Sequence, residues 1–480
     1  MSTTPLPPTA TWGELLSGRN GLRSIALSGG VAVHAINVYI VTTILPSVVE
    51  DIGGLEYYAW NTTLFVAASI LGSALSSSLI DYLGLRASYL LAILIFMLGS
   101  IAAAVSPSMP FMLGARTIQG FGGGLLLGLS YSSVRMVFDE RLWPRAMALI
   151  SSMWGVATLA GPAVGGIFAE SGNWRLAFWS IIPVALVITV LVATQLKTRK
   201  ENRHHTVTRP PLLKIAFLTW SVIVIAFGSL AQSWLLIALS FVIVLTILYG
   251  MARDDANSDN PLFPHGTYSI KHPLGSLYAG IALMSIGVTS EIFIPYFLQT
   301  IHGIRPLAAG YMTALMSAGW TVGSVMMASR SPLFANKLLR IGPVVSAISL
   351  AALGLLLPWQ GLQTELHALW LLYIPLFGMG LGVGMIWPHL LTRVFKSSEP
   401  GQENLASSAI TTLQLYAMSI GAAVASMITA AAGFNEGTIE SAQQASMALL
   451  LSFALVPLVF VFVSGAARKA GDVTATTPQE

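Results

Sequence analysis

The sequence contains no cysteine and little charge. The absence of Cys from all 480 residues excludes disulfide frameworks, thiolate metal sites and cysteine nucleophiles. Only 9% of the residues are charged, against roughly a quarter in a soluble domain, while 55% are hydrophobic and the mean hydropathy is +0.74. A chain of this composition cannot keep its surface in water, so we expect lipid to be its solvent.

Signals for cleavage and for catalysis are also missing. Residues 1–23 are polar and rich in Pro and Thr, without the basic region, apolar core and cleavage site of a signal peptide. No loop is long enough for a catalytic domain, and no phosphate-binding glycine loop occurs. We therefore expect neither an enzyme nor ATP drive, no cofactor or metal, and no nucleic-acid partner.

Long apolar runs are what the chain has in abundance. About 20 mostly apolar residues cross a hydrocarbon layer of about 30 Å as a helix. Six such segments precede a basic stretch at 197–209, two short ones follow it, and six more come after a polar loop at 253–271. The segments lie near 24–49, 57–80, 87–106, 109–137, 143–169, 174–196, 212–230, 233–252, 273–300, 306–329, 341–360, 366–392, 404–433 and 443–466. The sequence thus predicts an all-α membrane protein with fourteen transmembrane helices.

The distribution of charge orients these helices. Cytoplasmic loops of membrane proteins hold an excess of Lys and Arg. With the N-terminus inside, all of the 24 Lys and Arg residues except Arg116, Arg175 and Arg305 fall in or beside cytoplasmic segments. The outer loops instead hold the acids Glu50, Asp51, Glu56, Glu170, Glu365, Glu436 and Glu440. An odd number of spans would invert half of this sorting, so we expect both termini in the cytoplasm and the chain in the cytoplasmic (inner) membrane.

Five parts follow from this plan. They are a cytoplasmic tail (1–23), an N-terminal six-helix half (24–196), a basic loop with two extra helices and a second cytoplasmic loop (197–272), a C-terminal six-helix half (273–466) and a C-terminal tail (467–480).

Polar residues at the ends of and inside the predicted spans are candidate functional residues. The turn 78–86 contains Asp81, Gly84 and Arg86, which could form a charged pair around a tight turn or simply an ordinary charged loop. Arg116 lies inside the span 109–137, where a cation must face the protein interior or a partner. Its alternative role is structural, with the guanidinium bonded to backbone carbonyls.

The span 143–169 carries small residues and a proline in one region. Glycines at these positions would cut a groove in one helix face, and the proline removes a backbone donor, so a kink and a close helix crossing become possible. Plain helix packing is the alternative function. The residues are Gly155, Gly161, Pro162, Gly165 and Gly166.

In their order along the chain, these segments resemble signatures of the major facilitator superfamily, in its 14-helix drug:proton antiporter branch. Residues 78–86 resemble the family's Gly-x-Leu-Ala-Asp-Arg-x-Gly-Arg charge latch, although Ser78, Tyr82 and Leu85 depart from it. Residues 116–122 match Arg-x-x-Gln-Gly-x-Gly, and 161–166 resemble the antiporter signature Gly-Pro-x-x-Gly-Gly of exporters. The resemblance implies two six-helix halves around a midplane site, two extra central helices, and export.

The predicted span 24–49 departs from that branch at the position where the branch usually has a proton-coupling aspartate. Aligned on Pro46, this position is Asn37, which cannot carry a proton. His34 lies one turn earlier and could titrate near neutral pH, or could remain a neutral, hydrogen-bonded histidine.

Glu291 is the one acid of the twenty that falls well inside a predicted span. Burial disfavours the charged form of a carboxyl group, so Glu291 could load and release a proton during a transport cycle. A purely structural, hydrogen-bonded role is the alternative. Other polar or aromatic side chains could line a substrate cavity, although many membrane aromatics only pack or sit in interfacial belts. These candidates are Asn37, Trp154, Tyr296, Gln299, Trp387, Gln414 and Tyr416.

Three classes of function remain open. The first is a proton-coupled exporter of a drug-like or amphiphilic compound, a monomer whose partners are the small organic substrate, protons and the bilayer. The second is a dedicated exporter of one metabolite such as a siderophore. The third is a receptor or scaffold, in which the buried Arg116 and Glu291 would have no evident use.

Overall fold

The fold is helical throughout the part of the chain that the computed structural model describes. That part comprises residues 11–139, 142–196, 211–228, 230, 234–258, 260–327, 330, 332–359, 368–399 and 402–468. Every regular element in these ranges is an α-helix or a 3-10 helix. The whole of the predicted basic stretch 197–209, and nearly all of the predicted C-terminal tail, lie outside the described residues.

The N-terminal group of helices covers the first six predicted spans. The predicted N-terminal tail contains a short helix, α1 (Trp12–Leu16), and the first span begins earlier than expected, at Gly18. The sixth span is divided at Ser180. The remaining elements are α2 (Gly18–Ile52), η1 (Leu55–Tyr57), α3 (Trp60–Leu83), α4 (Leu85–Ala104), α5 (Met109–Val137), α6 (Trp143–Glu170), α7 (Arg175–Trp179) and α8 (Ile181–Gln195).

The C-terminal group covers the last six predicted spans. Its first span is broken, because a 3-10 turn, η3, joins α11 to α12. The elements are α11 (Pro273–Val288), η3 (Thr289–Ile292), α12 (Ile294–His302), α13 (Pro306–Met327), α14 (Pro332–Leu356), α15 (Trp370–Ser397), α16 (Glu403–Ala431), η5 (Phe434–Glu436) and α17 (Ile439–Val463).

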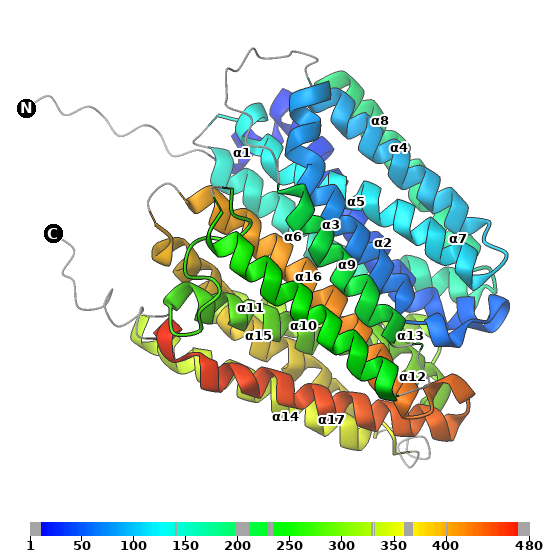
Figure 1. Ribbon diagram of the computed structural model, residues 1–480. Helices are drawn as coiled ribbons and strands as arrows, with labels where there is room; N and C mark the ends of the chain where they lie inside the picture. The colour runs from blue at the N-terminus through cyan, green and yellow to red at the C-terminus, as the bar shows by residue number, and fades with distance from the viewer. Residues whose placement is uncertain are drawn as a thin grey trace, which may run out of the picture.

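Two further helices, α9 (Leu212–Gly228) and α10 (Trp234–Ala256), lie between the groups in sequence and in space. Figure 1 shows them in green, in front of the bundle, between the blue α3 and the orange α16. Helix α9 contacts both α3 and α16 as well as α10. The extra helices therefore cover the seam along which α3 and α16 meet.

Ten helical stretches among the described residues are long and apolar enough to cross a membrane. Helix α9 is a shorter apolar helix of 17 residues. The helical membrane architecture is thus confirmed, while the count of fourteen spans stays a prediction.

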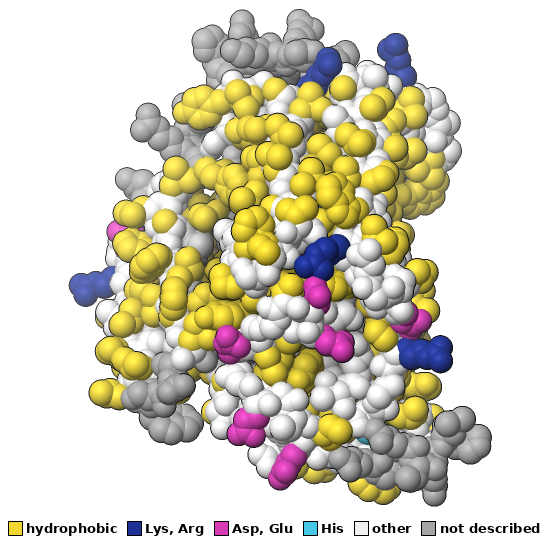
Figure 2. All heavy atoms as spheres, turned by 90° about the vertical axis from the view of Figure 1, so that its right-hand side faces the viewer, with side chains coloured by type: hydrophobic (Ala, Val, Ile, Leu, Met, Phe, Trp, Pro, Cys, Tyr) yellow, Lys and Arg dark blue, Asp and Glu magenta, His cyan; other side chains and the backbone are white. Residues whose placement is uncertain are grey.

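The bundle has two ends, which we call the termini face and the opposite face. Figure 1 shows both ends of the chain emerging on the left, which defines the termini face, whereas the α2–α3 connection lies at the lower right. Figure 2 views the molecule from that right-hand side and shows acidic side chains gathered in its lower part, with hydrophobic side chains spread above them. On the opposite face Arg175 forms a salt bridge with Asp51 at 2.5 Å. Arg175 is one of the three basic residues that the sequence did not place in or beside a cytoplasmic segment, and it has an acidic partner here.

Close helix crossings inside each group depend on glycine. A Cβ atom on Gly124 of α5 would collide with the backbone of Ser69 in α3, and one on Gly380 of α15 would collide with the carbonyl oxygen of Met316 in α13. Small residues permit this approach, and close packing replaces the hydrophobic effect as the force that joins helices in lipid.

Candidate functional site

A buried polar network surrounds Arg116 in the N-terminal group. Arg116 lies on α5 and is 1% exposed. Its guanidinium donates to the Oε1 atom of Gln119, one turn along the same helix, and lies 4.0 Å from the ring centroid of Phe65 on α3. No carboxylate pairs with Arg116 among the residues described, so a neutral amide and an aromatic face are what balance this cation.

Gln119 is the centre of that network. Its Nε2 atom donates to Asn37 Oδ1 at 3.1 Å and to Ser100 Oγ at 2.7 Å, while its carbonyl oxygen accepts from Arg116. One amide thereby joins α2, α4 and α5, and fixes the position of the guanidinium. Because Asn37 is a neutral acceptor, the cluster keeps the full positive charge of Arg116 at its core.

His34 lies next to this network on α2. Its ring stacks on Phe65 at 5.2 Å and meets Trp154 of α6 edge-on at 6.0 Å. The side chain is 2% exposed, and its Nδ1 atom has no hydrogen-bond partner in the described part of the chain. Three residues predicted separately, His34, Asn37 and Arg116, thus share one buried region with Trp154.

Glu291 lies in the C-terminal group, at the 3-10 break η3 between α11 and α12. The side chain is half-buried, and no hydrogen bond or ion pair holds its carboxylate within the described ranges. Glu291 is close enough to Tyr39 of α2 for the two side chains to interact electrostatically. The Tyr39 hydroxyl lies 3.3 Å from Ser317 Oγ on α13, so α2 and the C-terminal group meet at this position. The structure does not bring Glu291 within hydrogen-bonding distance of the Arg116 network.

The remaining cavity candidates are scattered over several elements. Tyr296 packs in an aromatic cluster with Tyr58. The ring centroids of Trp387 on α15 and Trp320 on α13 are 4.9 Å apart. The Tyr416 hydroxyl is 2.8 Å from Ser221 Oγ, so it is engaged by the extra helix α9. Two glutamines, Gln299 on α12 and Gln414 on α16, are half-buried. The Nε2 atom of Gln299 has no hydrogen-bond partner within the described ranges.

The small residues of α6 lie in two different helix contacts. A Cβ atom on Gly161 would collide with Tyr39, and one on Gly165 would crowd Ile40 and Thr43, so these positions allow α6 to approach α2. Gly166 instead faces Leu307 of α13.

The second contact crosses between the two groups. Pro162 faces Gly310 of α13, and the carboxylate of Glu170 accepts from the Leu307 amide at 3.2 Å. Gly155, nearer the start of α6, has open space around it. The segment 161–170 therefore joins the N-terminal group to the C-terminal group near the opposite face.

The predicted charged turn lies on the termini face. Gly84 has a φ of 78°, a left-handed conformation that glycine adopts without strain, and it separates α3 from α4. Asp81 is exposed on the last turn of α3, and Arg86 is half-buried in the first turn of α4.

One buried cluster was not expected from the sequence. Asp255, which is 1% exposed at the end of α10, accepts from Lys214 Nζ of α9 at 2.8 Å and from the backbone amides of Leu262 and Phe263. The Tyr268 hydroxyl also donates to it at 2.7 Å. Burial and the neighbouring Asp255 carboxylate raise the pKa of Tyr268. In the sequence, Asp255 is followed by a Pro-Leu-Phe-Pro segment, and this is the feature that could have indicated the cluster. The spacing of these residues does not by itself show that the loop folds back onto Asp255.

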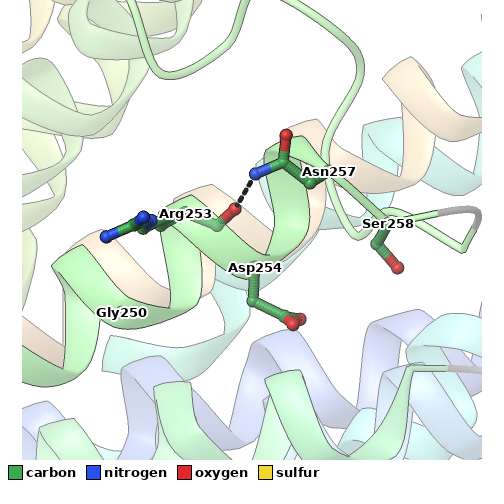
Figure 3. A pocket seen from close by; sticks show the side chains of 5 residues that line it. All are labelled: Gly250, Arg253, Asp254, Asn257 and Ser258. Carbon is green, nitrogen blue, oxygen red and sulfur yellow. Dashed lines mark hydrogen bonds between the residues drawn. The ribbon is translucent and has the colours of Figure 1, made fainter.

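A surface hollow of about 410 Å³ lies beside this cluster and is lined by residues of α10 and the loop after it. Figure 3 shows the Asn257 side chain turned back to the carbonyl oxygen of Arg253, a hydrogen bond of 2.8 Å. None of the predicted site residues lines the hollow. In the part of the chain that is described, no group of three His, Asp or Glu side chains is arranged to hold a metal ion.

Comparison with known proteins gives consistent results. A family model described as Major Facilitator Superfamily matches residues 27–422. A probable multidrug-efflux transporter of Mycobacterium tuberculosis (strain H37Rv) is 34% identical over 432 residues, covering 88% of this chain and 90% of the relative. Multidrug resistance protein 3 of Bacillus subtilis (strain 168) is 21% identical over 403 residues, covering 82% of this chain and 77% of the relative.

Solved structures give the same architecture. A POT family transporter in complex with 5-aminolevulinic acid superposes with a TM-score of 0.66, covering 95% of this chain and 98% of that one. A D-xylose-proton symporter gives a TM-score of 0.63, covering 94% of this chain and 99% of that one. Both are 14% identical in sequence, so these likenesses show the fold alone.

Proposed function

Because the chain belongs to the major facilitator superfamily, as its sequence indicated, we propose that it exports a small drug-like or amphiphilic compound by proton antiport. Export is supported by the relative named as a probable multidrug-efflux transporter and by the glycine-rich α6 segment. Membership in this family indicates a membrane transporter rather than an enzyme.

The proposed mechanism is alternating access between the two groups of helices. In this proposal the chain has fourteen spans, both termini in the cytoplasm, and two six-helix halves that rock around a midplane site. The contact of Gly166 and Glu170 with Leu307 would open and close as the halves move. The chain would act as a monomer, with the bilayer as solvent.

The single observation that supports proton coupling best is the position of Glu291. Its carboxylate has no described partner, lies where the helix is broken, and is close to Tyr39 of the other group. An acid at membrane depth is costly when charged and much less so when protonated. Loading and release of a proton at Glu291 would therefore change the free energy of the contact between the halves. Arg116, in contrast, would act as a fixed charge in the N-terminal group.

The Glu291→Gln variant tests this proposal. In everted vesicles carrying a preformed pH gradient, we expect the parent protein to collapse the gradient when substrate is added and the variant to lose this response. Glu56→Gln, on an exposed acid of the opposite face, is the matched control and should behave as the parent protein. Undiminished proton-driven transport by Glu291→Gln would rule out this role.

A dedicated metabolite exporter is the second candidate. Asn37 stands where the broad-specificity branch has an acid, and its carbonyl is already bound by Gln119. A panel of drugs, metabolites and metal chelators in the same vesicle assay separates the two. Gradient collapse by a single compound class favours the dedicated exporter, and collapse by many unrelated compounds favours broad efflux.

A further inference from the structure

An aromatic side chain of the N-terminal group is inserted into the C-terminal group at the opposite face. Tyr58 directly follows η1, in the connection between α2 and α3, and is 1% exposed. Its ring stacks on Phe293 at 5.2 Å and meets Tyr296 and Phe434 edge-on at 5.4 and 5.8 Å. Phe293 and Tyr296 flank the start of α12, and Phe434 begins η5.

The C-terminal rings form a preassembled cup. Tyr296 and Phe434 lie 4.8 Å apart, and Phe293 and Phe434 lie 5.2 Å apart. Phe297 closes the base, 6.0 Å from Phe293 and fully buried. These rings contact one another independently of Tyr58, so the cup can persist when Tyr58 leaves it. Tyr58 is therefore the one ring of the five that the N-terminal group supplies.

The hydroxyl group of Tyr58 weakens this contact. It is buried and has no hydrogen-bond partner among the described residues. A buried hydroxyl without a partner loses its hydrogen bonds to water, and it recovers them when the site opens. The aromatic contacts thus favour the closed opposite face, while the orphaned hydroxyl favours its opening.

We propose that Tyr58 is a releasable latch that holds the opposite face closed by insertion into the cup of Phe293, Tyr296, Phe297 and Phe434. The latch goes beyond the proposed proton antiport, because it acts on the closed state whatever ion or substrate drives the cycle. Its strength is set by the two opposing contributions of one side chain. A tyrosine serves here better than a phenylalanine, because a stronger latch would slow opening.

The absence of cysteine from the chain makes the latch measurable. Thr43 of α2 is 1% exposed and lies against Gly310 of α13, so a Thr43→Cys reporter is covered while the opposite face is closed. The rate at which a membrane-impermeant maleimide labels this thiol, added from the opposite face to membranes containing the full chain, reports the open population.

We expect Tyr58→Ala to raise the labelling rate about tenfold, because several aromatic contacts of about 0.5–1.5 kcal/mol each are lost from the closed state alone. Tyr58→Phe removes only the orphaned hydroxyl, so it should slow labelling about fivefold and lower the transport rate. Tyr58→Leu keeps apolar volume without the aromatic ring, so its labelling rate should lie between those of the parent protein and Tyr58→Ala. This variant keeps the test available if Tyr58→Ala does not fold.

Tyr278 provides the matched control. It is also a buried tyrosine, but its hydroxyl donates to the carbonyl oxygen of Ala406 at 3.0 Å within the C-terminal group. Tyr278→Ala should lower thermal stability and leave the labelling rate unchanged. Parent-like labelling of both Tyr58→Ala and Tyr58→Leu, faster labelling of Tyr58→Phe, or equal acceleration by Tyr278→Ala would each overturn the latch. The Glu291→Gln test does not use the Tyr58 variants, and its outcome should leave the labelling differences among those variants unchanged. Proton coupling through Glu291 and the Tyr58 latch can therefore be disproved independently.

Discussion

At the residue scale, Gln119 is the polar side chain that links the candidate site together. It is fully buried, and its amide bonds Arg116, Asn37 and Ser100. A half-satisfied polar network is costly, since each buried group that loses its partner keeps the cost of leaving water. The guanidinium of Arg116 depends most on this amide, because no described acid could replace it.

Replacing Gln119 by leucine should therefore lower stability by about 1–3 kcal/mol, because several buried polar groups lose their partner at once. Thermal unfolding of the purified protein in detergent measures this change. Gln299→Leu is the control. The Nε2 atom of Gln299 has no hydrogen-bond partner among the residues described, so this substitution should leave stability unchanged or raise it slightly. An unchanged midpoint for Gln119→Leu would show that the network does not hold Arg116.

At the scale of elements, α6 packs closely against two different helices along its length. Gly161 and Gly165 pack on α2 within the N-terminal group, while Gly166 packs on α13 across the two groups. The atom that a Cβ on Gly166 would meet first is the Cα of Leu307, which cannot turn aside as the end of a side chain can. A substitution at Gly166 must therefore push the two helices apart.

Gly166→Ala should accordingly destabilise the closed opposite face and reduce transport about tenfold, since overpacking of this kind costs about 1–3 kcal/mol. Gly155→Ala, in the same helix and the same predicted signature, meets nothing within 4 Å and should transport like the parent protein. Vesicle transport at matched protein levels provides the comparison. Equal activity of the two variants would contradict a role of Gly166 in the contact between the groups.

At the scale of the whole molecule, acidic side chains gather on the opposite face (Figure 2), whereas both chain termini lie on the other side of the bundle (Figure 1). Acids of the opposite face include Asp51, Glu56, Glu170 and Glu436, which end or precede helices there. If the positive-inside rule holds, the opposite face is outside the cell.

Single cysteines test this orientation. We expect an impermeant maleimide to label Glu56→Cys in intact cells, because this residue is exposed on the opposite face. Asn257→Cys, exposed after α10 on the termini face, should be labelled only in everted vesicles. The reverse pattern would invert the topology. Labelling of both positions from one side would contradict the odd number of predicted spans between them.

The sequence by itself determined the properties that depend on composition and order. Apolar length predicted the helices, and the signatures at 116–122 and 161–166 indicated the family that the comparisons confirm. The rarity of charge inside spans singled out Arg116 and Glu291, because each charge in lipid is expensive enough to need a reason.

Only the tertiary structure decided which side chains meet. Membrane helices are apolar around most of their circumference, so periodicity does not show which face turns inward or how neighbouring helices are rotated. Gln119 as the link to Asn37, Tyr416 as a partner of α9, and Tyr58 in its cup each depend on that rotation. The break at η3, which places Glu291 near Tyr39, depends on local backbone geometry that a continuous apolar run does not reveal.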